Sequence, residues 1–95
     1  MATELALEMG LNHNEFFRTL PAAMGELSYR IEDHQVVAEH DDRRLTIRLD
    51  PQSERRIALL RVPYTWVRFR FEDYSESEVK AFMDRFQRHF QRGGG

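Results

Sequence analysis

The chain contains no cysteine. This absence excludes disulfide bonds, metal sites built on thiolates and every reaction that needs a thiol. Small secreted domains commonly depend on disulfides for stability. Their absence therefore favours a reducing compartment, and we expect a cytoplasmic protein.

Long apolar runs are also missing. No stretch approaches the roughly 18 apolar residues that a membrane-spanning helix requires. Residues 1–10 carry Glu4 and Glu8 but no lysine or arginine, so they do not resemble a signal peptide. We therefore expect no membrane partner.

Acidic and basic residues are nearly balanced. The formal net charge is −2, which provides no overall attraction to nucleic acid. Lysine is nearly absent, because thirteen of the fourteen basic residues are arginine and only Lys80 is lysine. A GC-rich genome would explain this bias. The functional alternative is selection of the planar guanidinium group, which binds phosphate and carboxylate.

The apolar residues are numerous enough for a folded core. The chain has 95 residues, 41% of them hydrophobic, and seven are phenylalanine. We therefore predict a single domain over residues 1–95 rather than a disordered chain. A domain of this size removes only about 60–65% of its unfolded surface from water. An interface with a partner would therefore add useful stability.

The N-terminal quarter is predicted to be helical. Residues 1–11 have weak helical character because Leu5 and Met9 are four residues apart, and they are expected to be loosely ordered. Asn14 is a candidate N-cap for a short helix through Leu20, with Phe16 and Phe17 on its apolar side.

The helical pattern ends between Pro21 and Gly25. Pro21 is expected to end the helix or to begin one more turn, and Gly25 stops it. Beyond this point the apolar residues recur with a period of two, which indicates strands. Five strands are predicted, at residues 27–31, 35–39, 44–49, 56–62 and 65–72.

The C-terminal helix has the clearest signals. Ser75 and Glu78 form a capping box, and Tyr74 and Val79 occupy the positions of a hydrophobic staple. An apolar stripe follows at helical spacing, formed by Val79, Phe82, Met83, Phe86 and Phe90. Residues 93–95 are all glycine and are predicted to form a flexible tail.

These elements predict an α+β domain. Short connections join consecutive strands, which is typical of a five-stranded antiparallel meander sheet. We expect an N-terminal helical segment, and a C-terminal amphipathic helix packed on one face of the sheet.

The turns suggest a register for the sheet. If Pro63 and Tyr64 form a two-residue hairpin loop, Val62 lies opposite Thr65. A second assumption places Leu49 opposite Arg56. Together they put one set of residues on an inner face under the C-terminal helix: Leu45, Ile47, Ala58, Leu60, Val62, Val67, Phe69 and Phe71.

The opposite face would then hold an apolar centre inside a ring of arginines. It carries Thr46 and the candidate interaction residues Arg44, Arg48, Ile57, Leu59, Arg61, Trp66, Arg68 and Arg70. Leaving large apolar side chains exposed forfeits roughly 1.5–3 kcal/mol each. This face therefore requires an explanation.

Three interpretations compete for this face. The N-terminal segment could fold over it, with Phe16, Phe17 and Leu20 covering Trp66. It could be a protein interface, because tryptophan and arginine are enriched at binding hot spots. It could also stack bases and bind phosphates, although few aromatic residues and an acidic net charge make nucleic acid the less favoured partner.

Motifs for catalysis or for cofactors are not found. No histidine pair has the spacing of a zinc motif, no nucleophile elbow occurs, and no glycine-rich loop precedes a helix. His40, Asp41 and Asp42 could supply metal ligands, but an aspartate-rich segment more commonly forms a turn. We predict no catalytic, cofactor-binding or metal residues.

We therefore expect a non-enzymatic interaction or assembly module. It would use the Trp66 face and be homodimeric or dock on another protein. A nucleic-acid-binding module on the same face is the first alternative. An enzyme with its site at a dimer seam is the second.

Overall fold

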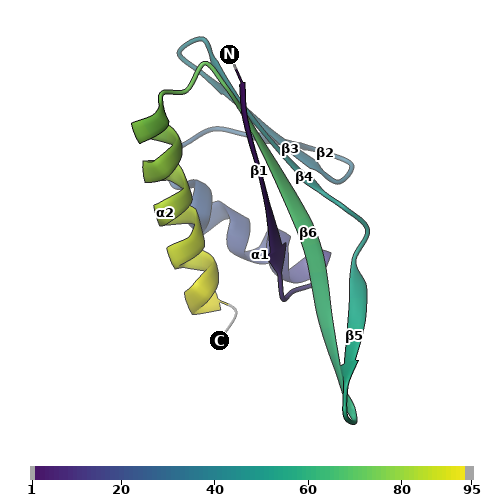
Figure 1. Cartoon of the computed structure of the whole chain (residues 1–95). Coiled ribbons are helices and arrows are strands. Elements are labelled where there is room, and N and C mark those ends of the chain that lie inside the picture. Colours follow the sequence, from purple (N-terminus) through teal and green to yellow (C-terminus); the bar gives the residue numbers. More distant parts are fainter. Residues whose placement is uncertain (1, 94–95) are drawn as a thin grey trace.

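The computed structural model describes residues 2–93. It shows two helices and a six-stranded antiparallel sheet, which confirms the predicted α+β class (Figure 1). The elements in chain order are β1 (Ala2–Met9), α1 (His13–Met24), β2 (Arg30–Glu32), β3 (Gln35–His40), β4 (Arg43–Leu49), β5 (Ser53–Ile57), β6 (Leu60–Glu72) and α2 (Glu76–Gly93).

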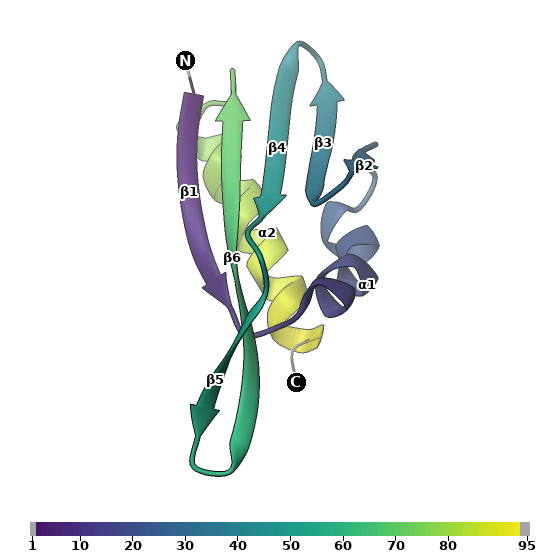
Figure 2. The ribbon, with the colours of Figure 1, turned by 90° about the vertical axis from the view of Figure 1, so that its right-hand side faces the viewer.

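The sheet is not a simple meander. Its strand order is β1-β6-β4-β3-β2, and β5 pairs only with β6. The first and last strands of the chain are therefore neighbours, with β6 between β1 and β4. Figure 2 shows that β5 and the first part of β6 extend well beyond the other strands.

The N-terminal prediction was wrong, because residues 2–9 form a strand. Leu5 and Met9 are four residues apart, and this spacing fits a period of two as well as a helical period. The register places Leu5 opposite Phe69 and Glu4 opposite Arg70. Pairing along the whole length of β1 thus overrides a weak local preference for helix.

Helix α1 starts two residues earlier than predicted. Its N-cap is Asn12 rather than Asn14, because the Asn12 side chain accepts a hydrogen bond from the Glu15 amide at 2.8 Å. The Glu15 carboxylate in turn accepts from the Asn12 amide at 3.0 Å, which completes a capping box. Of the two alternatives for Pro21, the second is confirmed, because the helix continues for one more turn past Pro21 and ends before Gly25, whose φ is 62°.

The strands differ most from the prediction around residues 56–65. The hairpin turn is at Ala58 and Leu59, and not at Pro63 and Tyr64. The predicted register is therefore wrong at this hairpin, because Val62 lies opposite Arg55.

The outer strands also differ in length. The structure replaces the strand predicted at 27–31 with β2, which covers only Arg30–Glu32. The strands predicted at 35–39 and 44–49 are confirmed, each one residue longer at one end.

Both helices cover the same face of the sheet. Phe69 of β6 packs edge-to-face on Phe86 of α2 at 5.1 Å between ring centroids, and Phe16 of α1 stacks on Phe90 at 5.2 Å. The expected inner residues Leu45, Ile47, Val67, Phe69 and Phe71 are all buried, whereas Ala58, Leu60 and Val62 are not part of this core.

The position of α1 decides one of the open alternatives. Phe16 and Leu20 are fully buried in the core beneath the sheet. They cannot also cover Trp66, which lies on the other face and is 40% exposed. The interpretation that the N-terminal segment covers the outer face was therefore wrong, and neither helix of residues 2–93 packs on that face.

Candidate interaction surface

The projecting hairpin of residues 53–64, here called the arm, is the main departure from a compact shape. β6 pairs with both β1 and β4 over residues 67–72, but over 60–64 it pairs with β5 alone. The molecule measures 48 × 23 × 22 Å (Figure 1). An isolated two-stranded ribbon is only marginally stable in water. The arm therefore needs support from the body of the domain or from a partner.

One side of the arm carries most of its large apolar side chains, and it also carries Arg55, which lies opposite Val62. The register pairs Ile57 with Leu60 and Ser53 with Tyr64 on this side, since residues opposite each other share a face. Alternate residues of β6 continue the same side into the sheet. The set, here called the apolar stripe, consists of Ile57, Leu60, Val62, Tyr64 and Trp66.

The two ends of the apolar stripe are open to water, while Val62 and Tyr64 in its middle are half-buried. Ile57 is 58% exposed and Leu60 is 66% exposed, while Leu59 at the apex of the turn is fully exposed. Burying a side chain of this kind stabilises a protein by roughly 1.5–3 kcal/mol. Contiguous exposed apolar surface of this type marks interaction sites more often than ordinary surface.

An ion pair connects the arm to β1. The Arg55 Nη2 atom donates to the Glu8 carboxylate at 2.6 Å, and the Arg55 guanidinium lies 4.4 Å from the centroid of the Tyr64 ring. The hydrogen bond to Glu8 is the main cause that raises the pKa of Arg55 above its usual value. This contact fixes the base of the arm relative to the sheet.

The turn of the arm contains an unusual backbone conformation. Ala58 has a φ of 57°, and of the two turn residues it alone has a positive φ. A positive φ at the first central residue is typical of a type II′ turn, which normally places glycine there. An alanine in the left-handed region costs about 1–2 kcal/mol relative to its preferred conformation. The apex of the arm is thus strained and apolar at once.

The free edges of the arm are protected against pairing with another strand. In a two-residue hairpin the amide of Leu60 points toward β5, so the backbone of residues 61 and 63 points away from it. Pro63 has no amide hydrogen to donate there. Glu54 and Arg56 place charges along β5, a second device that discourages edge pairing. The arm is therefore suited to contacts through its face.

Charge pairing dominates the rest of the open face of the sheet. Arg68 donates to both oxygens of Asp50 at 2.9–3.1 Å, and Arg70 donates to Glu4 at 3.2 Å. The hydrogen bond from Arg68 lowers the pKa of Asp50 below its usual value. These arginines are thus neutralised within the chain, largely by carboxylates that the structure places beside them on β1 and before β5.

The eight predicted interaction residues divide into two groups. Five lie on the open face of the sheet: Arg44, Arg48, Trp66, Arg68 and Arg70. The other three are in the arm, where Ile57 is in the apolar stripe, Leu59 is at the apex and Arg61 is on the opposite side. The structure therefore does not bring all eight into one ring around Trp66.

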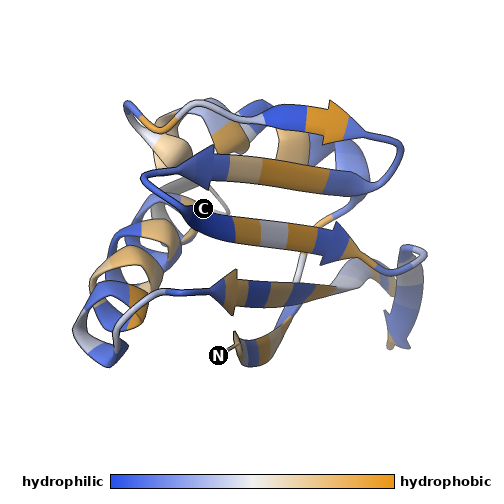
Figure 3. Ribbon diagram, turned by 90° about the horizontal axis from the view of Figure 1, so that it is seen from above, coloured by the Kyte–Doolittle hydropathy of each residue, from blue (hydrophilic) through white to orange (hydrophobic). Residues whose placement is uncertain are grey.

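The sequence analysis missed three members of the apolar stripe. Leu60 and Val62 were assigned to the inner face, and Tyr64 to a turn. The signal was available, because residues 60, 62, 64 and 66 are all apolar or aromatic and alternate along one strand. In the body of the domain, Figure 3 shows hydrophobic and hydrophilic bands that alternate along β6. Taking Pro63 as a turn residue interrupted this pattern.

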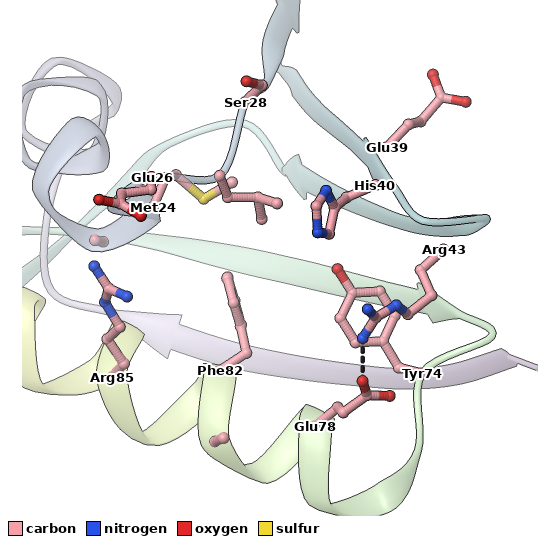
Figure 4. Close-up of a pocket in the computed structure, with 13 residues that line it drawn as sticks. Met24, Glu26, Ser28, Glu39, His40, Arg43, Tyr74, Glu78, Phe82 and Arg85 are labelled. Atoms are coloured by element: carbon pink, nitrogen blue, oxygen red, sulfur yellow. Dashed lines mark hydrogen bonds and ion pairs between the residues drawn. The ribbon is translucent and has the colours of Figure 1, made fainter.

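Apart from the arm, a hollow lies between the helices and the β3–β4 turn (Figure 4). Its floor includes Met24, Leu27 and Phe82, and its rim is charged. Arg43 bonds Glu78 and lies over the ring of Tyr74 at 5.6 Å. Burial is the main cause that raises the pKa of Tyr74. These charged and aromatic groups are thus engaged with one another.

The structure gives no support for a metal at the β3–β4 turn. Asp41 and Asp42 both have positive φ values, of 49° and 62°, as expected for a tight turn. The His40 Nε2 atom lies 3.0 Å from the Asp41 carboxylate, and both side chains are well exposed. Within residues 2–93, no group of three histidine or acidic side chains is arranged to hold a metal ion.

Comparison with protein-family models, with curated proteins and with solved structures finds no match for this chain. The function of this protein is therefore inferred from the surface of the chain itself. Neither helix in the described part of the chain is long and apolar enough to cross a membrane.

Proposed function

We propose that this protein is a non-enzymatic assembly module that forms a homodimer through the arm and its apolar stripe. The observation that carries the proposal is an exposed apolar stripe on a ribbon that projects from the body of the domain. Trp66 lies at the end of the apolar stripe that is nearest the body of the domain. A cytoplasmic location belongs to the same proposal.

The chain exposes more surface than a compact domain of its mass. Its exposed area is 6623 Å². A compact monomer of 11.4 kDa exposes about 5,800 Å². The molecule is also elongated. Its radius of gyration is 13.8 Å, whereas about 12.4 Å is typical of a compact domain of this length.

The charge distribution supports a second copy as the partner. Three arginines and one glutamate give the arm a formal charge of +2, which leaves −4 on the rest of the chain. Opposite charges on the arm of one copy and the body of another favour their encounter. The apolar stripe then provides the buried centre of the contact, and the arginines form its rim.

A nucleic-acid partner is less favoured by the same contacts. Phosphate binding requires basic groups that can release counterions. On this surface Arg55, Arg68 and Arg70 are already paired with carboxylates of the chain itself. An enzyme with its site at a dimer seam stays an untested alternative.

The test is a Trp66→Ala variant studied by sedimentation velocity over a dilution series. We expect its dimer to dissociate at least about 30-fold more readily than wild type, which corresponds to the roughly 2 kcal/mol of a hot-spot residue. The matched control is Ile31→Ala, because Ile31 is 51% exposed but lies in β2 at the far edge of the sheet. A wild-type chain that stays monomeric at high concentration would refute the proposal.

Trp66 also reports on the interface directly, because it is the only tryptophan. Its emission should be blue-shifted in the dimer and move to the red on dilution. Red emission that a single-stranded oligonucleotide quenches, with salt restoring it, would instead support the nucleic-acid alternative.

A further inference from the structure

We infer that the apex of the arm anchors the protein on an anionic phospholipid surface. Its exposed apolar side chains enter the lipid interface, and two arginines behind them bind the lipid phosphates. This inference goes beyond the proposed homodimer and does not depend on it, because Leu59 at the apex lies outside the apolar stripe. Ile57 and Leu60 belong to both surfaces, so lipid and a second copy compete for them.

The apex is the most exposed apolar part of the arm. Leu59 is fully exposed, and Ile57 and Leu60 beside it are each more than half exposed. Figures 1 and 2 show the turn at the far end of the arm, away from both helices. A convex end of this kind fits no cavity of the described chain. A fluid lipid interface accepts it without a shaped pocket.

Two arginines lie directly opposite each other just behind the apex. Arg56 of β5 pairs with Arg61 of β6, and like charges in such positions repel. Within residues 2–93, neither guanidinium forms an ion pair or a hydrogen bond, and Glu54 on the same face bonds neither of them. A phosphate that accepts from both guanidinium groups would remove the repulsion. The pair is therefore suited to bind an anion that the chain itself does not supply.

The order of these groups along the arm matches the layers of a phospholipid surface. The arginine pair lies one residue position, about 3.3 Å, behind the pair of Ile57 and Leu60. In a bilayer the phosphates likewise lie outside the acyl chains. Arginine can also keep its aliphatic stem on apolar groups while its charged end reaches the phosphates. A free phosphate or a nucleic acid offers no apolar layer behind its charge, so lipid is the favoured ligand.

The charge distribution orients the molecule with the arm toward such a surface. The arm has a formal charge of +2 and the rest of the chain −4. Seven residue positions separate Leu59 from Trp66 at the body end of the arm, or about 23 Å along β6. This length exceeds the Debye length of about 8 Å at physiological salt. The acidic body therefore stays beyond most of the repulsion from anionic lipid.

This contact differs from the membrane partners that the sequence analysis considered. That analysis expected none because it looked for spanning segments and signal peptides. A surface anchor needs neither, since its binding strength comes from a modest buried apolar area together with attraction of basic groups to anionic lipid.

The first experiment is cosedimentation with vesicles of equal parts phosphatidylcholine and phosphatidylglycerol. We expect wild type to bind them, to bind pure phosphatidylcholine vesicles much less, and to dissociate as salt is raised. Leu59→Ser should weaken binding at least about tenfold, because the most exposed apolar group of the apex is lost. The matched control is Ile31→Ser, since Ile31 is an exposed apolar residue of β2 at the far edge of the sheet.

A pair of double variants tests the arginines. Arg56→Gln combined with Arg61→Gln should weaken binding to the anionic vesicles roughly 20-fold, since each basic residue at such a surface contributes to the attraction. Arg44→Gln combined with Arg48→Gln removes the same charge from exposed positions of β4 and should have little effect.

A tryptophan at the apex tests whether the apex enters the acyl layer. Leu59→Trp combined with Trp66→Phe has its only tryptophan at the turn. Its emission should be quenched by vesicles whose acyl chains carry bromine. Trp66 of the wild-type chain lies too far from the apex to be quenched in the same way.

The outcomes separate this inference from the proposed function. Absence of binding to anionic vesicles would overturn it, as would equal binding by Leu59→Ser and Ile31→Ser. Binding to a single-stranded oligonucleotide but not to vesicles would overturn it in favour of nucleic acid. A wild-type chain that is monomeric in sedimentation yet binds vesicles would refute the homodimer and support the lipid anchor.

Discussion

Both halves of β6 alternate apolar and polar residues, but the apolar residues occupy even positions in the arm and odd positions in the body, so they face opposite sides of the strand. In the body, Val67, Phe69 and Phe71 are buried beneath the helices, and strands pair on both edges of β6. In the arm, β6 has one neighbouring strand and no layer on either face. One strand thus contributes to stability at one end and exposes apolar groups at the other.

The junction between the halves is a single buried polar residue. Thr65 is completely buried, and its hydroxyl donates to the carbonyl of Leu11 at 2.9 Å. This bond joins β6 to the segment between β1 and α1. Beyond it, the contact between Arg55 and Glu8 connects the arm to the sheet. The comparison teaches that an interaction element can be built by extending a core strand past its supporting layers.

The largest expected effect is on the free energy of unfolding, when a side chain in either half of β6 is shortened to alanine. Phe69→Ala should lower the free energy of unfolding by about 3–5 kcal/mol, since a buried aromatic ring is lost. Leu60→Ala should change monomer stability by less than about 0.5 kcal/mol, because the side chain is already exposed. Urea denaturation at low protein concentration measures both. Equal losses would show that the arm is part of the core.

A smaller effect on stability is expected at two residues with positive φ, when Gly25 is replaced by alanine and Ala58 by glycine. Gly25→Ala should destabilise the body by about 1–3 kcal/mol, because alanine is strained at a φ of 62° with a ψ of −125°. Its Cβ would also overlap the Arg85 guanidinium.

Ala58→Gly should relieve the corresponding strain in the arm. The gain should stay below about 1 kcal/mol, since glycine also gains freedom in the unfolded chain. Slower amide exchange confined to residues 53–64 would show it, while urea denaturation measures the loss from Gly25→Ala. Faster exchange in the arm of Ala58→Gly would contradict the expected strain.

The smallest expected effect is on the thermal stability of the protein at low pH. The Glu78 carboxylate accepts a hydrogen bond from the Ser75 amide, and this bond is the main cause that lowers the pKa of Glu78 below its usual value. Such a group stabilises the fold above its unfolded pKa, and the contribution is lost as pH falls through the lower folded value. Glu78→Gln should therefore flatten the decline in thermal stability below about pH 4.5. An unchanged acid profile would contradict this assignment.

Much of the body could be predicted from local patterns. The capping box of Ser75 and Glu78 is present, with the Glu78 amide donating to the Ser75 hydroxyl at 3.2 Å. β4 and the buried residues of β6 in the body also follow from alternation. These features depend on residues within a few positions of each other, so the sequence contains them directly.

The position of β1 could not be predicted in the same way. Its eight residues fit either period, and pairing with a strand about 60 residues later decides between them. The carboxylates that neutralise Arg70 and Arg55 come from this strand. The sequence analysis therefore overestimated how many arginines are available to bind another molecule.

Local patterns are sufficient to predict the α+β class, the C-terminal helix and the alternation of β6 in the body. They do not reveal that both helices pack on one face, or that Pro63 lies in a strand instead of a turn. The range of the forces involved explains this difference. Periodicity and capping act within a turn or a strand, whereas the covered face and the unpaired edge depend on which distant segments meet.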